Sequence, residues 1–381
     1  MASSNLSTRE FHRILLIKPS ALGDVIHTVP VLVKLRQRYP DAQIDWMLSP
    51  AIAEWVGHHP ALNRVLEFDR KALVQPRKAP ALFWKLMKEL TTGGYDLVID
   101  LHGQFRSAFF TLATGAPVRI GFDRPRKKSF SSIRQLPAEA YKHGWTGARE
   151  ISWVAYSHHI AIPTLEAHAV DRYLWLGEML AFSPEAPDFH VPIPAEAAAH
   201  AAELLARHGA VNRPLLLISP GTVWDTKRWR TDGFAEVARH FIGQGWSVAV
   251  IGSGNDRAVC SELVNMCPAA INLCGQTNIS ELAALTQRAD LCITNDSGPM
   301  HLAVALQRPV VSIFGPTDPL WIGPYGRPHA VVRLNLPCSP CYLRSVRQCP
   351  HGHACMRDIE ARDVIEKANE VLKDSSRSIA V

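Results

Sequence analysis

Residues 291–318, LCITNDSGPMHLAVALQRPVVSIFGPTD, carry the pattern that decides the fold of this chain. The apolar runs 291–294 and 310–314 have the length and composition of buried parallel strands. Apolar residues between them recur at helical spacing, and Pro309 ends that helix because proline cannot continue it. The segment therefore predicts strand, helix and strand, the repeating unit of a doubly wound α/β sheet.

The turn between the first strand and the helix has features of an anion site. Ser297 can cap the helix, and Pro299 suits its first turn, where a missing N–H costs nothing. The free N–H groups and positive dipole end of a helix N-terminus attract phosphate. Asp296 and His301 flank this spot, although an ordinary strand-to-helix turn would explain Asp-Ser-Gly equally. The turn 315–318 ends the next strand at the same sheet edge, which favours the functional interpretation.

The composition is typical of a soluble protein with two domains of ordinary size. The chain has 381 residues, 47% of them apolar and 20% charged, and no apolar run long enough to span a membrane. Its N-terminus, MASSNLSTREFHR, lacks the pattern of a secretion signal. The net charge of +6 weakly favours an anionic partner and does not by itself indicate nucleic acid.

Strands and helices alternate along the rest of the chain, which indicates parallel sheets covered on both faces. The proline-rich segment 183–194 is the best candidate for a linker. In the first predicted helix, Pro30 lies too deep for the first turn, so we expect a kink or a break there. The predicted parts are a first domain at 13–182, the linker at 183–194, a second domain at 195–357 that includes a cysteine-rich segment at 338–355, and a final helix at 358–373. The tryptophans at 46, 55, 84, 153 and 175 are predicted to lie in the core.

The loop 18–28 follows the first predicted strand and places a carboxylate at a strand-to-helix turn. This loop has one glycine, Gly23. A dinucleotide-binding loop needs several glycines so that its backbone can closely approach a pyrophosphate. A dinucleotide oxidoreductase is therefore disfavoured. Asp24 can act in catalysis, although helix capping would also explain an aspartate at this position.

A second loop, 220–229, follows a predicted strand in the second half of the chain. It combines a turn at Gly221 with the adjacent cations Lys227 and Arg228. Such a loop suits a diphosphate, with Lys227 acting as a point charge on a leaving group. A solvated basic loop would have the same composition.

Several motifs in one order resemble the heptosyltransferases of lipopolysaccharide core synthesis over about residues 13–330. They are KPSALGDVIHT at 18–28, DLHGQFR at 100–106, PGT with KRW at 220–229, NDSGPMH at 295–301 and FGPTD at 314–318. This resemblance implies an α/β fold of the GT-B type, with two doubly wound Rossmann-like domains facing across a cleft. It also implies an inverting glycosyltransferase that transfers heptose from ADP-L-glycero-D-manno-heptose to a Kdo or heptose acceptor of the inner core.

The resemblance assigns roles to particular residues. Asp24 would be the general base, because inversion by single displacement needs a base opposite the leaving group. Lys227 and the helix after Asp296 would stabilise the departing diphosphate, so no cofactor is needed for the chemistry. The implied nucleotide-sugar contacts are Gly23, Thr222, Lys227, Thr277, Asp296, Ser297, Gly298 and His301. The implied contacts to an anionic precursor of the Kdo-lipid A type are Arg106, Arg124, Arg126 and Lys127.

The resemblance further implies a bacterial cytoplasmic enzyme with peripheral contact to the inner face of the cytoplasmic membrane and no nucleic-acid partner. Two alternatives stay open. One is a protein O-heptosyltransferase like those acting on autotransporters, which also carry a metal-binding cysteine cluster. The other is a non-catalytic nucleotide-binding protein with a metal-clipped interaction module.

Four of the eight cysteines lie close together in the sequence. Cys338 and Cys341 form a C-x-x-C pair, and Cys349 and Cys355 follow. Four thiolates can close a tetrahedral structural site around zinc or iron, and a histidine at 351 or 353 could replace one of them. Free thiols in a basic loop are the alternative.

Overall fold

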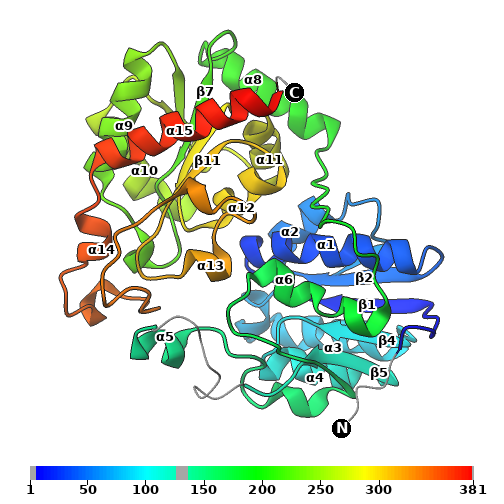
Figure 1. The fold of residues 1–381 in the computed structure, drawn as a ribbon. Helices are drawn as coiled ribbons and strands as arrows, with labels where there is room; N and C mark the ends of the chain where they lie inside the picture. The colour runs from blue at the N-terminus through cyan, green and yellow to red at the C-terminus, as the bar shows by residue number, and fades with distance from the viewer. Residues whose placement is uncertain (1–5, 126–135, 380–381) are drawn as a thin grey trace. The chain divides into compact units, whose positions relative to one another are not determined.

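The computed structural model describes residues 6–125 and 136–379. Its contacts divide the chain into two compact units, shown in Figure 1. The first comprises Met1–Ile133 and Trp145–Pro192, and the second comprises Arg134–Gly144 and Ile193–Val381. The division at Pro192 falls inside the proline-rich segment. The described residues 136–144 belong with the second unit, although the sequence pattern placed them in the first domain.

The first unit is built on a six-stranded parallel sheet with the order β3-β2-β1-β4-β5-β6. Its strands are β1 (Arg13–Ile17), β2 (Gln43–Leu48), β3 (Arg64–Glu67), β4 (Leu97–Asp100), β5 (Val118–Phe122) and β6 (His158–Ile160). Its helices are α1 (Leu22–Arg38), α2 (Pro50–Val56), η1 (Ala72–Val74), α3 (Ala79–Thr92), α4 (Phe105–Ala113), η2 (Ser152–Ala155), α6 (Ala169–Leu174) and α7 (Gly177–Leu180).

The second unit has another six-stranded parallel sheet, ordered β12-β11-β10-β7-β8-β9. Its strands are β7 (Leu215–Ser219), β8 (Ser247–Val250), β9 (Ile271–Asn272), β10 (Leu291–Asn295), β11 (Val310–Ile313) and β12 (Val331–Val332). Its helices are α5 (Ala138–His143), α8 (Ala195–Arg207), η3 (Asp225–Lys227), α9 (Thr231–Gly243), η4 (Gly254–Asp256), α10 (Arg257–Met266), α11 (Ile279–Arg288), α12 (Gly298–Ala305), α13 (Pro319–Ile322), η5 (Pro328–Ala330), η6 (Val346–Gln348), α14 (Ala354–Arg357) and α15 (Ala361–Ile379).

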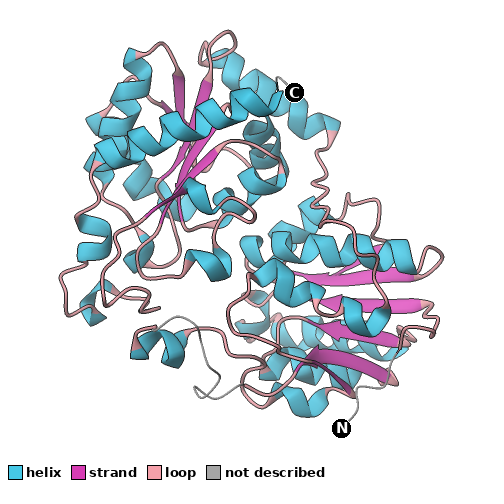
Figure 2. Ribbon diagram, viewed as in Figure 1, coloured by secondary structure: helices cyan, strands magenta, loops and turns pink. Residues whose placement is uncertain are grey.

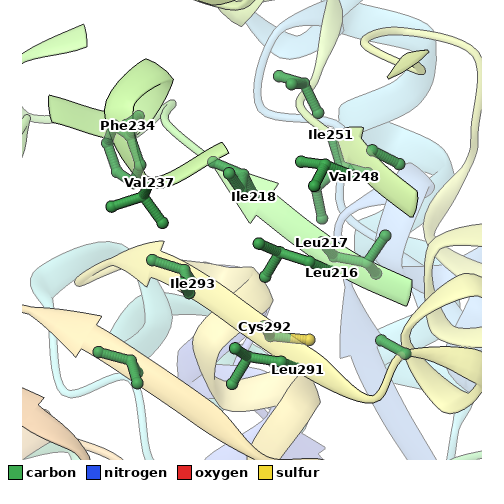
Figure 3. Packing of buried hydrophobic residues seen from close by; sticks show 14 of the residues in the cluster. Leu216, Leu217, Ile218, Phe234, Val237, Val248, Ile251, Leu291, Cys292 and Ile293 are labelled. Carbon is green, nitrogen blue, oxygen red and sulfur yellow. The ribbon is translucent and has the colours of Figure 1, made fainter. Parts of the chain in front are cut away.

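The central strands are buried because helices cover both faces of each sheet (Figure 2). Figure 3 shows the apolar side chains of β7, β8 and β10 packed with Phe234 and Val237 of α9. The strand registers align the carboxyl ends of neighbouring strands. Ile17 pairs with Asp100 in the first sheet, and Thr294 pairs with Ser219 in the second. The loops that follow these strands therefore meet at one edge of their own sheet, where ligands of such sheets bind.

Of the predicted kink or break at Pro30, the break does not occur, because α1 runs without interruption from Leu22 to Arg38. Proline removes one backbone hydrogen bond from the helix. Buried residues flank Pro30 on both sides, including Val29 and Val31, and this packing holds the helix together.

The last helix, α15, begins three residues later than the predicted 358–373 and extends to Ile379. Just before its start, the backbone oxygen of Ile359 accepts hydrogen bonds from Trp229 Nε1 and Arg230 Nε, and the N–H of Glu360 donates locally to Asp363. The tryptophan prediction holds for Trp46 and Trp55, which are fully buried, and is wrong for Trp84, which is exposed. Trp153 and Trp175 are only half-buried. None of the helices in the described part of the chain is long and apolar enough to cross a bilayer.

Candidate functional site

In the first unit, the loop after β1 and the first turn of α1 present the carboxylate of Asp24. The Tyr173 hydroxyl donates a hydrogen bond to Asp24 Oδ1 at 3.3 Å, and Lys18 Nζ lies 3.6 Å from the same oxygen. The backbone N–H of Ala21 donates to Oδ2 at 3.3 Å, so Asp24 also has the capping role. Its side chain remains 43% exposed. The carboxylate is thus held by two hydrogen-bond donors and a nearby ammonium group, and it is still partly exposed.

Lys18 is a buried cation with several partners. Its Nζ donates to the backbone oxygen of Leu101 at 3.1 Å and lies 4.9 Å from the ring centre of Tyr173. Burial disfavours the charged form, but the Asp24 carboxylate and the Tyr173 hydroxyl outweigh burial and raise the pKa of Lys18. The ammonium is therefore a permanent positive charge beside Asp24.

The loop after β4 adds His102 to this half of the site. Burial, reinforced by the charge of Lys18, lowers the pKa of His102 to about 4, so its ring is neutral at neutral pH. The loop is shaped by Asp100, whose Oδ1 accepts from the backbone N–H groups of His102 and Gly103 at 2.9 and 3.1 Å. Tyr156 donates to the other carboxylate oxygen at 2.8 Å. These bonds hold His102 near the Asp24 carboxylate.

The structure describes two of the four predicted acceptor-binding residues. Arg106 lies in the first turn of α4, with its guanidinium 5.9 Å from the ring centre of Phe68. Arg124 is exposed, and its backbone N–H donates to Asp123 Oδ1 at 2.7 Å. Arg126 and Lys127 lie outside the described residues.

The second unit brings Lys227 and Asp296 together from different loops. Lys227 Nζ lies 2.7 Å from Asp296 Oδ2, and both side chains are largely buried. The Thr317 hydroxyl donates to the same oxygen at 2.6 Å, and the ammonium stacks 4.5 Å from the Trp224 ring centre. Lys227 is therefore fixed by a carboxylate, an aromatic face and its own short helix, η3.

Asn295 ties the same loops together through its amide. Its Nδ2 donates to the backbone oxygen of Pro220 at 2.8 Å, and its Oδ1 accepts from the backbone N–H of Trp229 at 3.0 Å. Thr222 donates to the backbone oxygen of Asp296 at 3.4 Å. The 220–229 loop is thus anchored at both ends to the carboxyl end of β10.

Gly221 is required by a close approach within this loop. A Cβ atom at that position would lie 2.3 Å from Cγ of Asp256. Asp256 is itself held in its turn, because Oδ2 accepts from the hydroxyl and backbone N–H of Ser253 at 2.6 and 2.9 Å. The glycine therefore lets the loops after β7 and β8 pack against each other.

The remaining predicted nucleotide-sugar residues lie at helix starts. Helix α12 begins at Gly298, but the Ser297 side chain does not cap it; the hydroxyl instead donates to the backbone oxygen of Asn295 at 3.2 Å. His301 is buried in α12, and Thr277 is half-buried just before the first turn of α11. Gly23 lies buried in the first turn of α1, in the other unit.

The four clustered cysteines are free thiols that lie near one another. Burial, with added repulsion from Cys341, Cys338 and Cys349, raises the pKa of Cys355 to about 12. Nε2 of His353 lies 2.7 Å from the backbone oxygen of Thr226, within hydrogen-bond distance. Within the described residues no three His, Cys, Asp or Glu side chains are arranged as a metal site.

Sequence reasoning gave no role to Lys18, His102, Tyr173, Trp224 or Thr317. Lys18, His102 and Thr317 lie inside the motifs that resemble the family, and their positions there could have marked them as candidate site residues. Tyr173 is 149 residues from its partner Asp24, and single-sequence patterns do not report such pairs. Trp224 resembled an ordinary loop residue.

Comparison with known proteins gives consistent results. The family model described as glycosyltransferase family 9 (heptosyltransferase) matches residues 83–143 and 130–353. Lipopolysaccharide heptosyltransferase 1 of Pseudomonas aeruginosa is 31% identical over 89% of this chain and 88% of that protein. Lipooligosaccharide heptosyltransferase 2 of Haemophilus influenzae is 28% identical over 94% of this chain and 99% of that protein.

Solved structures show the same fold. A glycosyltransferase family 9 protein of Veillonella parvula has a TM-score of 0.77 and 24% identity, covering 96% of this chain and 98% of its own. Escherichia coli heptosyltransferase WaaC, solved with ADP-2-deoxy-2-fluoro heptose, has a TM-score of 0.67 and 23% identity, covering 94% and 99%. The predicted GT-B class is thereby confirmed. This chain belongs to glycosyltransferase family 9, the heptosyltransferases, and is a glycosyltransferase.

Proposed function

We propose that this enzyme transfers heptose from ADP-L-glycero-D-manno-heptose to a Kdo or heptose hydroxyl of the lipopolysaccharide inner core, with inversion by single displacement. The names of the relatives support the sugar and the pathway, and the WaaC structure supports an ADP-linked donor. The observation that carries the mechanism is the Asp24 carboxylate, which is exposed yet oriented by Lys18 and Tyr173.

Asp24 acts as the general base in this mechanism. The acceptor oxygen attacks the anomeric carbon, and its proton passes to the Asp24 carboxylate. The bond from the anomeric carbon to the diphosphate oxygen breaks, and ADP leaves with the electron pair. A base near the acceptor lowers the barrier because the hydroxyl becomes a stronger nucleophile as it loses its proton. The ammonium of Lys18, 3.6 Å from the carboxylate, favours its charged form electrostatically.

Lys227 and the N-terminus of α12 stabilise the negative charge that develops on the diphosphate. Lys227 is held in place before the donor arrives, so little reorganisation is needed. The further donor contacts are Thr222, Thr277, Ser297, Gly298 and His301, which stand at positions that match nucleotide-sugar contacts in the family. Asp296 acts mainly by fixing Lys227.

The acceptor is an anionic precursor of the Kdo-lipid A type. Arg106 and Arg124, with Arg126 and Lys127, supply the guanidinium and ammonium groups that bind its carboxylates and phosphates. The enzyme works in the cytoplasm on this precursor.

The test is to incubate the purified protein with ADP-heptose and Kdo-lipid A, and to follow ADP release and acceptor mass. We expect equal amounts of ADP and of acceptor carrying one added heptose. A panel with other nucleotide sugars, heptosylated acceptors and autotransporter peptides tests the specificity. ADP binding without turnover on any acceptor would identify a non-catalytic binder, and labelling of a peptide would identify a protein O-heptosyltransferase.

We also propose that Cys338, Cys341, Cys349 and Cys355 hold a structural zinc or iron ion. The C-x-x-C spacing of Cys338 and Cys341, followed by Cys349 and Cys355, supports this, and none of the four thiols is part of a disulfide. The ion would order a loop of the second unit and take no part in the chemistry, because four thiolates leave no open position.

A further inference from the structure

An unusual group of apolar side chains is exposed on one part of the first unit. Among the described residues twelve large hydrophobic side chains are exposed, and seven of them lie on the neighbouring elements η1, α3, α4 and η2 or next to η2. We call these seven the apolar patch: Val74, Trp84, Phe105, Phe109, Leu112, Ile151 and Val154. Trp84 is 70% exposed and Phe105 is 60% exposed.

The geometry of α4 shows that the exposure follows one helical face. Phe105, Phe109 and Leu112 recur at spacings of four and three residues and therefore share one side of the helix. The opposite side, including Phe110, is buried. Phe109 and Trp84 both contact the ring of Phe83, at centre-to-centre distances of 6.4 and 5.9 Å. The ring of Phe83 thus links the exposed rings of Trp84 on α3 and Phe109 on α4.

Positive charge accompanies the apolar patch. Between residues 70 and 92 the sequence contains a single acidic residue, Glu89, and six basic residues that are all exposed. They are Arg70, Lys71, Arg77, Lys78, Lys85 and Lys88. On α3, Lys88 lies one turn from Trp84 on the same side of the helix. Exposed aromatic rings beside cations that can reach outward are typical of side chains at a membrane interface.

A soluble protein rarely leaves so much apolar surface together without a partner for it. A second copy of the chain is a poor partner, because its six cations would be brought against these six. The partner must offer both apolar contact and negative charge. An anionic lipid bilayer offers acyl chains below a layer of phosphates, and this combination attracts basic, aromatic surfaces.

We propose that the apolar patch and its six cations form the surface by which this enzyme binds anionic lipid bilayers. Trp84, Phe105 and Phe109 enter the boundary between headgroups and acyl chains, and the lysines and arginines contact headgroup phosphates. Helix α4 starts just after β4, whose last residue pairs with Ile17 of β1. Phe105 therefore lies at the sheet edge that carries the Lys18 to Asp24 loop, and docking holds that loop close to the lipid surface.

The experiment is flotation of the full-length protein with vesicles of phosphatidylcholine alone or with one third phosphatidylglycerol, neither containing any acceptor. We expect binding to the anionic vesicles, weakening as salt is added, and little binding to the neutral ones. Trp84→Ser/Phe105→Ser should lower the partition coefficient about tenfold or more for each ring removed. Arg77→Gln/Lys78→Gln/Lys85→Gln should lower it about fivefold for each charge.

Matched controls come from exposed residues of the second unit. Val211→Ser/Met266→Ser also removes two exposed apolar side chains, although smaller ones, and Arg213→Gln/Arg288→Gln/Lys373→Gln removes the same charge. Both controls should bind vesicles like the parent. Failure of the parent to bind anionic vesicles, or equal losses in the controls, would overturn the proposal. So would self-association abolished by Trp84→Ser without vesicle binding, because the patch would then join two copies.

The inference is independent of the proposed transfer reaction. Activity on a soluble, deacylated acceptor should be the same in the parent and in Trp84→Ser/Phe105→Ser, whose unfolding midpoint should also be unchanged. If the parent protein binds anionic vesicles but has no transferase activity, only the proposed function is refuted. If the parent protein is active but does not bind anionic vesicles, only the docking surface is refuted.

Discussion

Lys227 Nζ lies 2.7 Å from Asp296 Oδ2 in the second unit, and both side chains are largely buried. Removing one member of such a pair leaves the other buried without its counter-charge, which typically costs about 3–5 kcal/mol. The pair therefore couples the stability of the unit to its proposed role in binding the diphosphate.

Lys227→Ala should weaken ADP binding, slow turnover and lower the midpoint of urea unfolding. Turnover should fall more than affinity, because the ammonium meets more negative charge in the transition state than in bound ADP. Calorimetry, steady-state kinetics and unfolding curves measure the three effects. In the double variant Lys227→Ala/Asp296→Asn part of the stability should return while the affinity stays low. Unchanged ADP affinity in Lys227→Ala would contradict the assignment.

Asp24→Asn should abolish transfer and leave ADP affinity nearly unchanged. The substitution keeps the size of the side chain but removes the base, and such a loss costs roughly 100- to 10,000-fold in rate. Single-turnover assays with calorimetry as the control separate the two quantities. A variant that retains more than half of the parental turnover would rule out Asp24 as the base.

Tyr173→Phe should reduce kcat about tenfold, since a hydrogen bond to a charged group contributes about 1.5 kcal/mol or more. The hydroxyl stabilises the ionised Asp24, so the acidic limb of the kcat/KM profile should move to higher pH when it is lost. The KM for the donor should not change. Tyr95→Phe is the matched control, because Tyr95 donates to Asp45 at 2.7 Å in the same unit. A parental pH profile in Tyr173→Phe would show that the hydroxyl is only structural.

Acid should destabilise the first unit through two neutral histidines. Burial lowers the pKa of His59 to about 4, and burial with the charge of Lys18 lowers that of His102 to about 4. Below about pH 6.5 the unfolded chain takes up protons that the folded unit does not bind. Stability is therefore complete above that pH and is lost as the pH falls toward 4, by up to ~1.4 kcal/mol per pH unit for each histidine.

The variant His59→Asn tests this explanation. Nδ1 of His59 accepts from the backbone N–H of Ala61 at 3.1 Å, and the asparagine oxygen can take over that bond. Urea unfolding at a series of pH values should show a shallower loss of stability in the variant than in the parent. Parallel curves would mean that His59 does not contribute to the acid sensitivity.

Protein purified anaerobically without a metal-chelating tag should contain close to one equivalent of zinc plus iron. Cys338→Ser/Cys341→Ser should lose the metal and unfold at lower temperature, because a structural ion adds its binding free energy to that of folding. Cys260→Ala/Cys274→Ala, which changes two thiols elsewhere in the same unit, should keep the metal. Elemental analysis showing less than about a tenth of an equivalent in the parent would defeat the proposal.

The sequence by itself determined the α/β class and the turns that carry the candidate site. The hydrophobic periodicity and the turn residues of segment 291–318 depend only on residues that are close in sequence. The structure has β10, α12 and β11 where this segment predicts them. The motif residues Asp24, Lys227 and Asp296 all follow strands, so the sheet edge at which they lie could also be predicted.

The tertiary structure decided which distant side chains meet. Tyr173 reaches Asp24, and Thr317 reaches Asp296, through sheet registers that no local pattern encodes. Burial of the residues around Pro30 keeps α1 continuous through this position, against the local preference of proline. Trp84 looked like a core residue from composition, and only the placement of α3 left it in solvent. Periodicity reports how a segment folds, whereas burial and pairing depend on what the rest of the chain brings against it.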